Sequence, residues 1–149
     1  MPVKIHAAAG LLGFLLIVGF WSSTVLSELF GSPDLVARVK ATILWGMAVL
    51  IPALALAGAS GMAIGRKRRD APALAKKKRM PFIALNGLLI LMPAAVFLAA
   101  RSQVGLFDAW FYGVQAIEII AGATNMVLLG LNIRDGMRMA GHRRQVAAR

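Results

Sequence analysis

The chain has 149 residues, of which 59% are hydrophobic and 15% charged, and its net charge is +11. Soluble domains carry roughly 45–50% apolar and about 25% charged residues, so a water-soluble fold of this size could not bury so much apolar surface. The basic residues stand in short segments between long apolar runs, which argues against nucleic-acid binding and indicates a membrane protein.

Four apolar runs are each long enough to cross a hydrocarbon core, which takes roughly 20 helical residues. They cover residues 5–29, 41–64, 80–100 and 110–133. A membrane β-strand would have about 10 residues of alternating polarity, which these runs do not show. The sequence therefore predicts an all-α polytopic membrane protein, with residues 1–149 forming one domain of four transmembrane helices.

The first run, residues 5–29, exceeds the apolar region of about 7–15 residues in a secretory signal peptide, so we interpret it as a retained helix. His6 at its start raises the hypothesis of an axial ligand to a b-type haem. Haem bundles ordinarily pair histidines on facing helices, whereas the second histidine here, His142, stands in the basic tail. We therefore favour an interfacial role for His6.

A helix-start signature precedes the second run. In Ser32-Pro33-Asp34 the serine can cap, the proline suits the first helical position and the aspartate faces the positive end of the helix dipole. We predict a helix from Pro33 to Gly65 that begins before its membrane span. Small residues recur in it at every fourth position and form a ridge for close helix packing: Ala53, Ala57, Gly61 and Gly65. The partner of this ridge, in the same chain or in a second copy, is left open.

Lysine and arginine set the expected orientation, because they resist translocation and stay in the cytoplasm. Fourteen of the seventeen lie near the N-terminus, in the loop 66–79 or in the tail 134–149, on one side of a four-span chain. We predict an antiparallel up-down bundle in a bacterial inner membrane. Both termini and the basic loop would then be cytoplasmic, where anionic lipids contact them.

Two prolines lie well inside spans, away from their ends. Pro52 and Pro93 lack the N–H that a continuous helix needs, so each is expected to free a carbonyl one turn back and to kink its helix. Beyond the third span, Asp108 is placed to cap the last helix and Gly136 to end it.

The fourth run holds most of the polar interior. Its polar residues are three, seven and seven positions apart and so share one helical face, which must look into the bundle: Gln115, Glu118, Asn125 and Asn132. Asn86 of the third run lies at a depth similar to that of Asn125. The two amides are therefore predicted to bond across the interior as structural contacts.

Glu118 is the carboxylate that the sequence places deepest in a span, and such a group is costly enough to indicate a function. Gln115 is its neighbour on the same face, and Ser22 and Ser23 of the first run lie at a similar depth. These four residues form a candidate site for proton or cation handling, in which the Glu118 carboxyl is expected to be largely neutral. The simpler interpretation is an interhelical hydrogen bond.

No catalytic residue and no metal site is predicted. Cysteine is absent, and the sequence contains no phosphate-binding loop, GxSxG or HExxH motif, or pair of catalytic carboxylates. An enzymatic role is left open and is not favoured.

Three functional hypotheses remain. We favour a structural or assembly subunit without its own catalysis or cofactor, as a homodimer or part of a larger membrane complex. The second hypothesis is a proton-coupled carrier or channel centred on Glu118, and the third is a haem-binding electron-transfer subunit that uses His6. A bundle without a cavity at Glu118 favours the first, a water-filled cavity the second, and a flat slot beside His6 the third.

Overall fold

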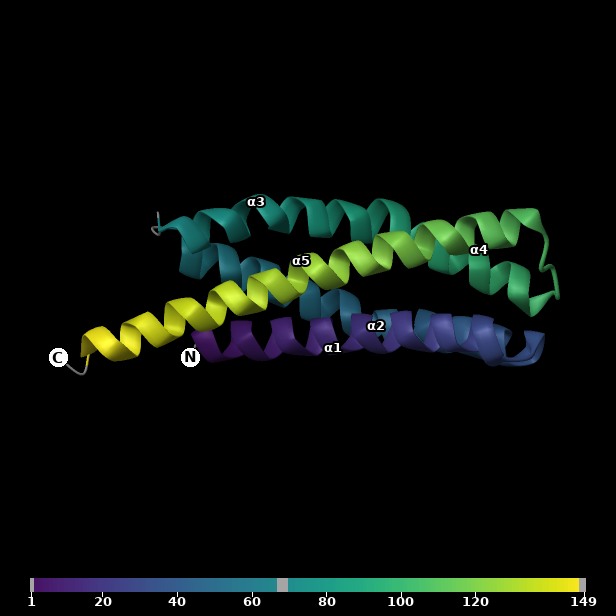
Figure 1. Ribbon diagram of the computed structural model, residues 1–149, viewed down its shortest axis with the longest axis horizontal. Coiled ribbons are helices and arrows are strands. Elements are labelled where there is room, and N and C mark those ends of the chain that lie inside the picture. Colours follow the sequence, from purple (N-terminus) through teal and green to yellow (C-terminus); the bar gives the residue numbers. More distant parts are fainter. Residues whose placement is uncertain (1, 67–69, 148–149) are drawn as a thin grey trace.

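The structure is a computed structural model that describes residues 2–66 and 70–147, with side chains for 3–66 and 70–141. The described chain is helical almost throughout (Figure 1). The helices are α1 (Pro2–Phe30), α2 (Pro33–Gly65), α3 (Ala71–Asn86), the π-helix η1 (Gly87–Leu91), α4 (Met92–Gln103) and α5 (Ala109–Ala147).

Four helical stretches are long and apolar enough to cross a membrane. They are Val3–Phe30, Pro33–Gly65, Ala71–Gln103 and Ala109–Gly141, so α3, η1 and α4 together make one of them. The predicted all-helical fold with four candidate spans is confirmed.

The predicted helix starts are present. The hydroxyl oxygen of Ser32 accepts a hydrogen bond from the backbone N–H of Leu35 at 3.3 Å, and Pro33 is the first residue of α2. Asp108 Oδ1 accepts a bond from the N–H of Phe111 at 3.0 Å, ahead of α5. Both caps satisfy a donor that the first helical turn leaves free.

Two segments expected to be non-helical are helical instead. α3 begins at Ala71, so most of the expected basic loop belongs to a helix, and α5 continues through Gly136 to Ala147. Alanine and lysine dominate the first segment, and arginine, methionine and alanine are frequent in the second; these residues favour helix, which outweighs the roughly 1 kcal/mol that a mid-helix glycine costs. Residues 67–69 of the loop and the side chains of 142–149 of the tail, His142 among them, lie outside the described residues.

A π-helical turn, which is wider than an α-helical one, precedes Pro93 in the third span. In η1 the N–H of Met92 bonds to the carbonyl of Gly87, and Pro93, which has no N–H to offer, stands in the first turn of α4. Such a π-turn relieves the clash that proline makes in a regular α-helix. Pro52, in contrast, lies inside the continuous helix α2.

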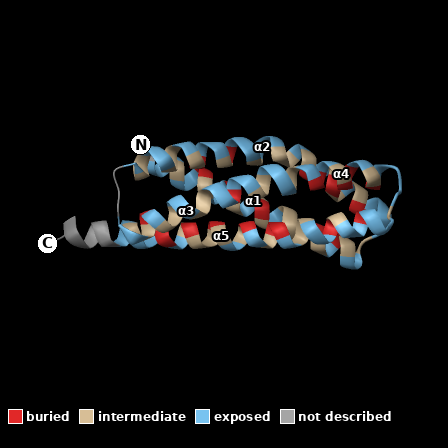
Figure 2. Ribbon diagram, turned by 90° about the horizontal axis from the view of Figure 1, so that it is seen from above, coloured by how far each residue is buried: buried red, intermediate tan, exposed pale blue. Residues whose placement is uncertain are grey.

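The helices pack around a thin core (Figure 2). α1 packs against α2 and α5, α2 also against α4, and α3 and α4 against α5. One apolar cluster centres on Ile17, Ile83 and Leu129, and another on Val36, Leu98 and Phe111. The α1–α2 and α4–α5 turns lie at the same end of the molecule, called here the turn end (Figure 1).

Much of the outer surface is apolar. Large hydrophobic side chains remain exposed on every long helix, for example Trp45 at 82%, Phe82 at 68% and Ile120 at 68%. A monomeric soluble protein rarely exposes so much apolar surface, whereas lipid tails solvate it well.

Candidate functional site

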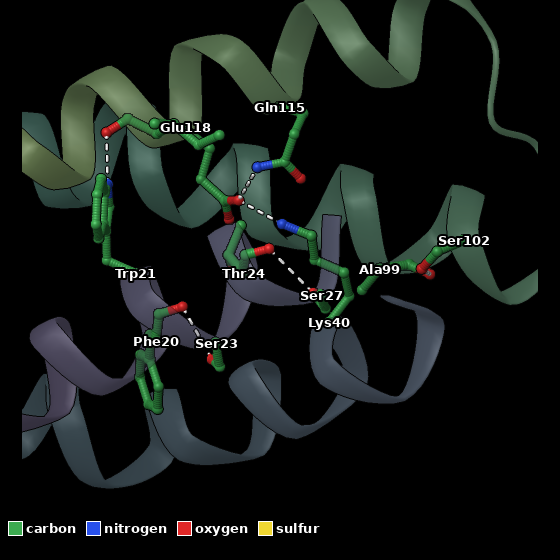
Figure 3. Close-up of polar contacts among 11 residues, drawn as sticks. Phe20, Trp21, Ser23, Thr24, Ser27, Lys40, Ala99, Ser102, Gln115 and Glu118 are labelled. Atoms are coloured by element: carbon green, nitrogen blue, oxygen red, sulfur yellow. Dashed lines mark hydrogen bonds and ion pairs between the residues drawn. The ribbon is translucent and has the colours of Figure 1, made fainter. Parts of the chain in front are cut away.

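A buried ion pair joins α2 to α5 near the turn end. Lys40 Nζ lies 2.5 Å from Glu118 Oε2, and their side chains are 1% and 12% exposed. The amide nitrogen of Gln115 donates to the same carboxylate oxygen at 3.1 Å. In Figure 3 the three side chains point toward one another. Glu118 is therefore paired with a positive charge and a second donor.

Lys40 is the residue of this site that the sequence analysis missed. The predicted second span starts after Lys40, and the sequence predicts no partner for this residue, whereas the structure buries its side chain inside the bundle, on helix α2. The spacing of the neighbouring apolar residues in the sequence does indicate that Lys40 is buried. Val36, Lys40 and Ile43 are four and three positions apart, so a helix from Pro33 puts the lysine on the same face as two apolar core residues.

The serines expected beside Glu118 do not bond to it. The hydroxyl of Ser23 donates to the carbonyl of Phe20 in its own helix at 3.0 Å. Among the described residues, no hydrogen bond joins Glu118 to Ser22, to Ser23 or to the carbonyl one turn before Pro52, because the lysine and the glutamine take its oxygen. Thr24 is the buried hydroxyl on this side of α1.

A small cavity adjoins Glu118. Its volume is about 70 Å³, and α1, α2, α4 and α5 all contribute to its walls. Apart from Thr24 and Glu118 its lining is apolar, with Trp21 and Met47 among the residues that face it. The indole N–H of Trp21 is turned away to the carbonyl of Ile119, to which it donates at 2.9 Å (Figure 3). The cavity has few groups that could hold a row of water molecules.

The amides of α5 bind α3. Asn86 donates to Asn125 Oδ1 at 2.9 Å, as the sequence predicts, and also to the carbonyl of Ala121 at 2.8 Å. Further along, Arg79 Nη1 lies 2.6 Å from Asp135 Oδ2 and 3.3 Å from Asn132 Oδ1. Asn125 is 1% exposed and Asn132 5%, so the polar face of α5 does look into the bundle.

His6 lies in the interface between α1 and α2. Its Nδ1 is 2.9 Å from the carbonyl oxygen of Ala57 and 3.2 Å from the hydroxyl oxygen of Ser60. The ring packs on Gly61, where an added Cβ would be 2.9 Å from its Cε1. Its Nδ1 is therefore occupied by contacts with α2. The haem-ligand role of His6 stays a prediction.

The small-residue ridge of α2 packs within the chain. Ala53 and Ala57 are buried, and Gly61 admits the His6 ring of α1. Gly65 at the end of the ridge faces the aliphatic part of Lys77 from α3, 3.6 Å from the position of an added Cβ. The ridge therefore meets two neighbouring helices of the same molecule.

Three buried polar atoms lack a hydrogen-bond partner among the described residues, and all belong to residues near the turn end: Glu28 Oε1, Arg101 Nε and Gln115 Oε1. Within the same residues, histidines and carboxylates form no group of three that could hold a metal ion.

Several of the described polar groups thus join two helices, and the ion pair of Lys40 and Glu118 lies next to two acceptors that have no donor. Comparison with protein families, with characterised proteins and with solved structures found no match to this chain.

Proposed function

We propose that this chain is a structural or assembly subunit of a bacterial inner-membrane complex and has no catalysis of its own. In this proposal it spans the membrane four times as an antiparallel up-down bundle, with both termini in the cytoplasm. Its basic residues then contact anionic lipids, and its exposed apolar surface contacts lipid and a partner, either a second copy or another membrane protein.

The observation that supports the proposal is that polar groups in the interior bond from one helix to another. Five contacts among them each join two helices: Lys40 with Glu118, Asn86 with Asn125, Arg79 with Asp135, Trp21 with the carbonyl of Ile119, and His6 with that of Ala57. Groups already paired in this way stabilise a scaffold, because each would be costly in lipid without its partner.

The cavity beside Glu118 also favours a scaffold over a carrier. A proton path needs a chain of water molecules or polar side chains. Here Glu118 is held by Lys40 and Gln115, and the adjoining 70 Å³ cavity is lined mainly by apolar side chains.

Three contacts support the proposed orientation, because they gather basic residues from separate segments at one end of the molecule. Arg79 of α3 pairs with Asp135 of α5, and an added Cβ at Gly136 would be 3.4 Å from Lys76 Nζ. Lys76 also acts electrostatically on His6, near the start of α1. This end is where the positive-inside rule puts the cytoplasm.

A topology experiment tests the orientation. Alkaline phosphatase fused after Arg68 is expected to be inactive and green fluorescent protein fused there fluorescent, because the loop would be cytoplasmic. The same fusions after Gly105, in the turn between α4 and α5, are expected to give the reverse result. An active phosphatase after Arg68 would show that the proposed orientation is inverted.

A reconstitution experiment tests the scaffold against the carrier. Vesicles that contain the purified chain and a pH-sensitive dye are expected to pass protons no faster than empty vesicles under an imposed potential. Glu118→Gln, which keeps the shape of the side chain, is the matched variant. Proton entry that depends on the chain and is lost in Glu118→Gln would replace the scaffold with a carrier.

Assembly is the second readout. Covalent crosslinking in native membranes is expected to trap the chain in a species larger than its own 15.8 kDa, either with itself or with a fixed partner. A chain that crosslinks to nothing at its apolar surface would contradict a subunit role.

A further inference from the structure

The buried ion pair has a second carboxylate beside it. Glu28, in the last turn of α1, interacts electrostatically with both Lys40 of α2 and Glu118 of α5. We call Glu28, Lys40, Gln115 and Glu118 the glutamate cluster. If both carboxyl groups are ionised, the cluster has two negative charges and one positive charge. An uncompensated charge in a poorly solvated site is unfavourable, and two carboxylates that share one site do not readily both stay ionised.

The cluster also has too few donors. Glu28 Oε1 and Gln115 Oε1 are buried, and neither accepts a hydrogen bond. Gln115 is only 4% exposed, and its amide nitrogen is bonded to Glu118, so its free oxygen is held next to the ion pair (Figure 3). Buried acceptors are nearly always paired, so two unpaired ones in a cluster of excess negative charge indicate a bound group that is positive.

Other charges at the turn end do not supply this group. Asp34 and Arg38 of α2 are exposed, and Arg101 of α4 pairs with Asp108. Lys4 is close to the N-terminus, at the opposite end of α1 from Glu28. Arg101 Nε bonds to neither carboxylate, and Lys40 is the one positive charge among the described residues that acts on Glu28.

We propose that the glutamate cluster binds one small cation, either a proton or a sodium ion. A proton converts one carboxylate into a neutral group that can donate a hydrogen bond. A sodium ion, as a hard cation, takes oxygen ligands such as the free oxygens of Glu28 and Gln115. Either cation leaves the cluster neutral, with Lys40 still paired to Glu118. This site goes beyond a scaffold role, since a bound cation can stabilise the bundle without crossing the membrane.

The sequence gives this proposal a specific probe. The chain has two glutamates, Glu28 and Glu118, and both belong to the cluster. Glutamate labelled with carbon-13 at the side-chain carboxyl therefore marks the cluster and leaves the four aspartates unlabelled. Infrared spectroscopy of the purified full-length chain then counts protonated glutamates by the isotope-shifted carbonyl band.

In choline chloride at neutral pH the wild type is expected to show one protonated glutamate per chain. Glu28→Gln is expected to lose the band, because one carboxylate then faces one lysine. Lys40→Met is expected to double it, because neither carboxylate keeps a counter-charge. Arg38→Met is the matched control for Lys40→Met, since it removes an exposed cation from the same helix, and it is expected to leave the band unchanged.

Replacing choline by sodium distinguishes the two cations. A band that sodium leaves unchanged identifies the bound group as a proton, and a band that sodium removes shows that the site takes the metal ion. Absence of a protonated glutamate in the sodium-free wild type overturns the proposal, as does an equal band in the wild type and a folded Lys40→Met. If Lys40→Met does not fold, the wild type and Glu28→Gln still decide the outcome.

Discussion

Glu118→Leu is expected to lower the free energy of unfolding by about 1–3 kcal/mol, because it removes the carboxylate bonded to the buried ammonium group of Lys40 and leaves only Glu28, which makes no hydrogen bond to it, as a counter-charge. Lys40 is 1% exposed, so water cannot reach it to replace the lost partner. Unfolding of the purified chain by sodium dodecyl sulfate in mixed micelles, followed by far-ultraviolet circular dichroism, measures the change.

The double variant Lys40→Met/Glu118→Leu is the control. Replacing both charges by apolar side chains of similar size removes the buried ion pair, and Glu28 without a counter-charge is expected to be neutral, so the stability is expected to return to the wild-type value or above it. If the double variant were as unstable as Glu118→Leu, the loss would come from packing around position 118 and not from the unpaired lysine.

Gly31→Ala is expected to destabilise the fold by about 1–3 kcal/mol through overpacking in the turn between α1 and α2. An added Cβ would lie 2.5 Å from the carbonyl oxygen of Ser27 and 3.0 Å from Leu35 Cδ2. The first of these atoms belongs to the backbone, which already accepts a hydrogen bond from the N–H of Gly31 at 2.8 Å, so it cannot move aside without opening the turn.

Gly10→Ala is the matched control for Gly31→Ala. It lies in α1, the helix that leads to Gly31, and an added Cβ there would meet nothing within 4 Å. Alanine in place of a mid-helix glycine favours the helix by roughly 0.5–1 kcal/mol, so this variant is expected to be neutral or slightly more stable. Equal losses in the same detergent titration would contradict the steric explanation for Gly31.

The sequence predicts the parts of this molecule that depend on local chemistry. Long apolar runs identified four candidate spans, and the capping roles of Ser32 and Asp108 follow from side chains that bond within one helical turn. The contact between Asn86 and Asn125 could also be predicted, because depth in a span is proportional to residue number along a straight helix.

The ion pair of Lys40 and Glu118 could not be predicted from where the second span is expected to begin. The predicted second span starts at residue 41, because lysine is expensive in a membrane interior, so Lys40 is left in the part of the helix that precedes the span. Its position on the apolar face of the helix that begins at Pro33 does indicate that it is buried. Glu28 could not be found in this way, since its relation to Glu118 depends on how α1 and α5 pack and not on any spacing in the chain.

The π-helix η1 changes which residues of α3 and α4 share a buried face. A helix turns by about 100° per residue, so on a regular helix the buried positions Ala95, Leu98 and Ser102 of α4 would be rotated by about a quarter turn from Ile83 of α3. The wider turn absorbs one residue and brings both sets to the same side, facing α5 and its neighbours. The third span therefore behaves as an ordinary helix with one inserted residue. A helical-wheel projection places its buried residues on one face only if that extra residue, within Gly87–Leu91, is left out of the count.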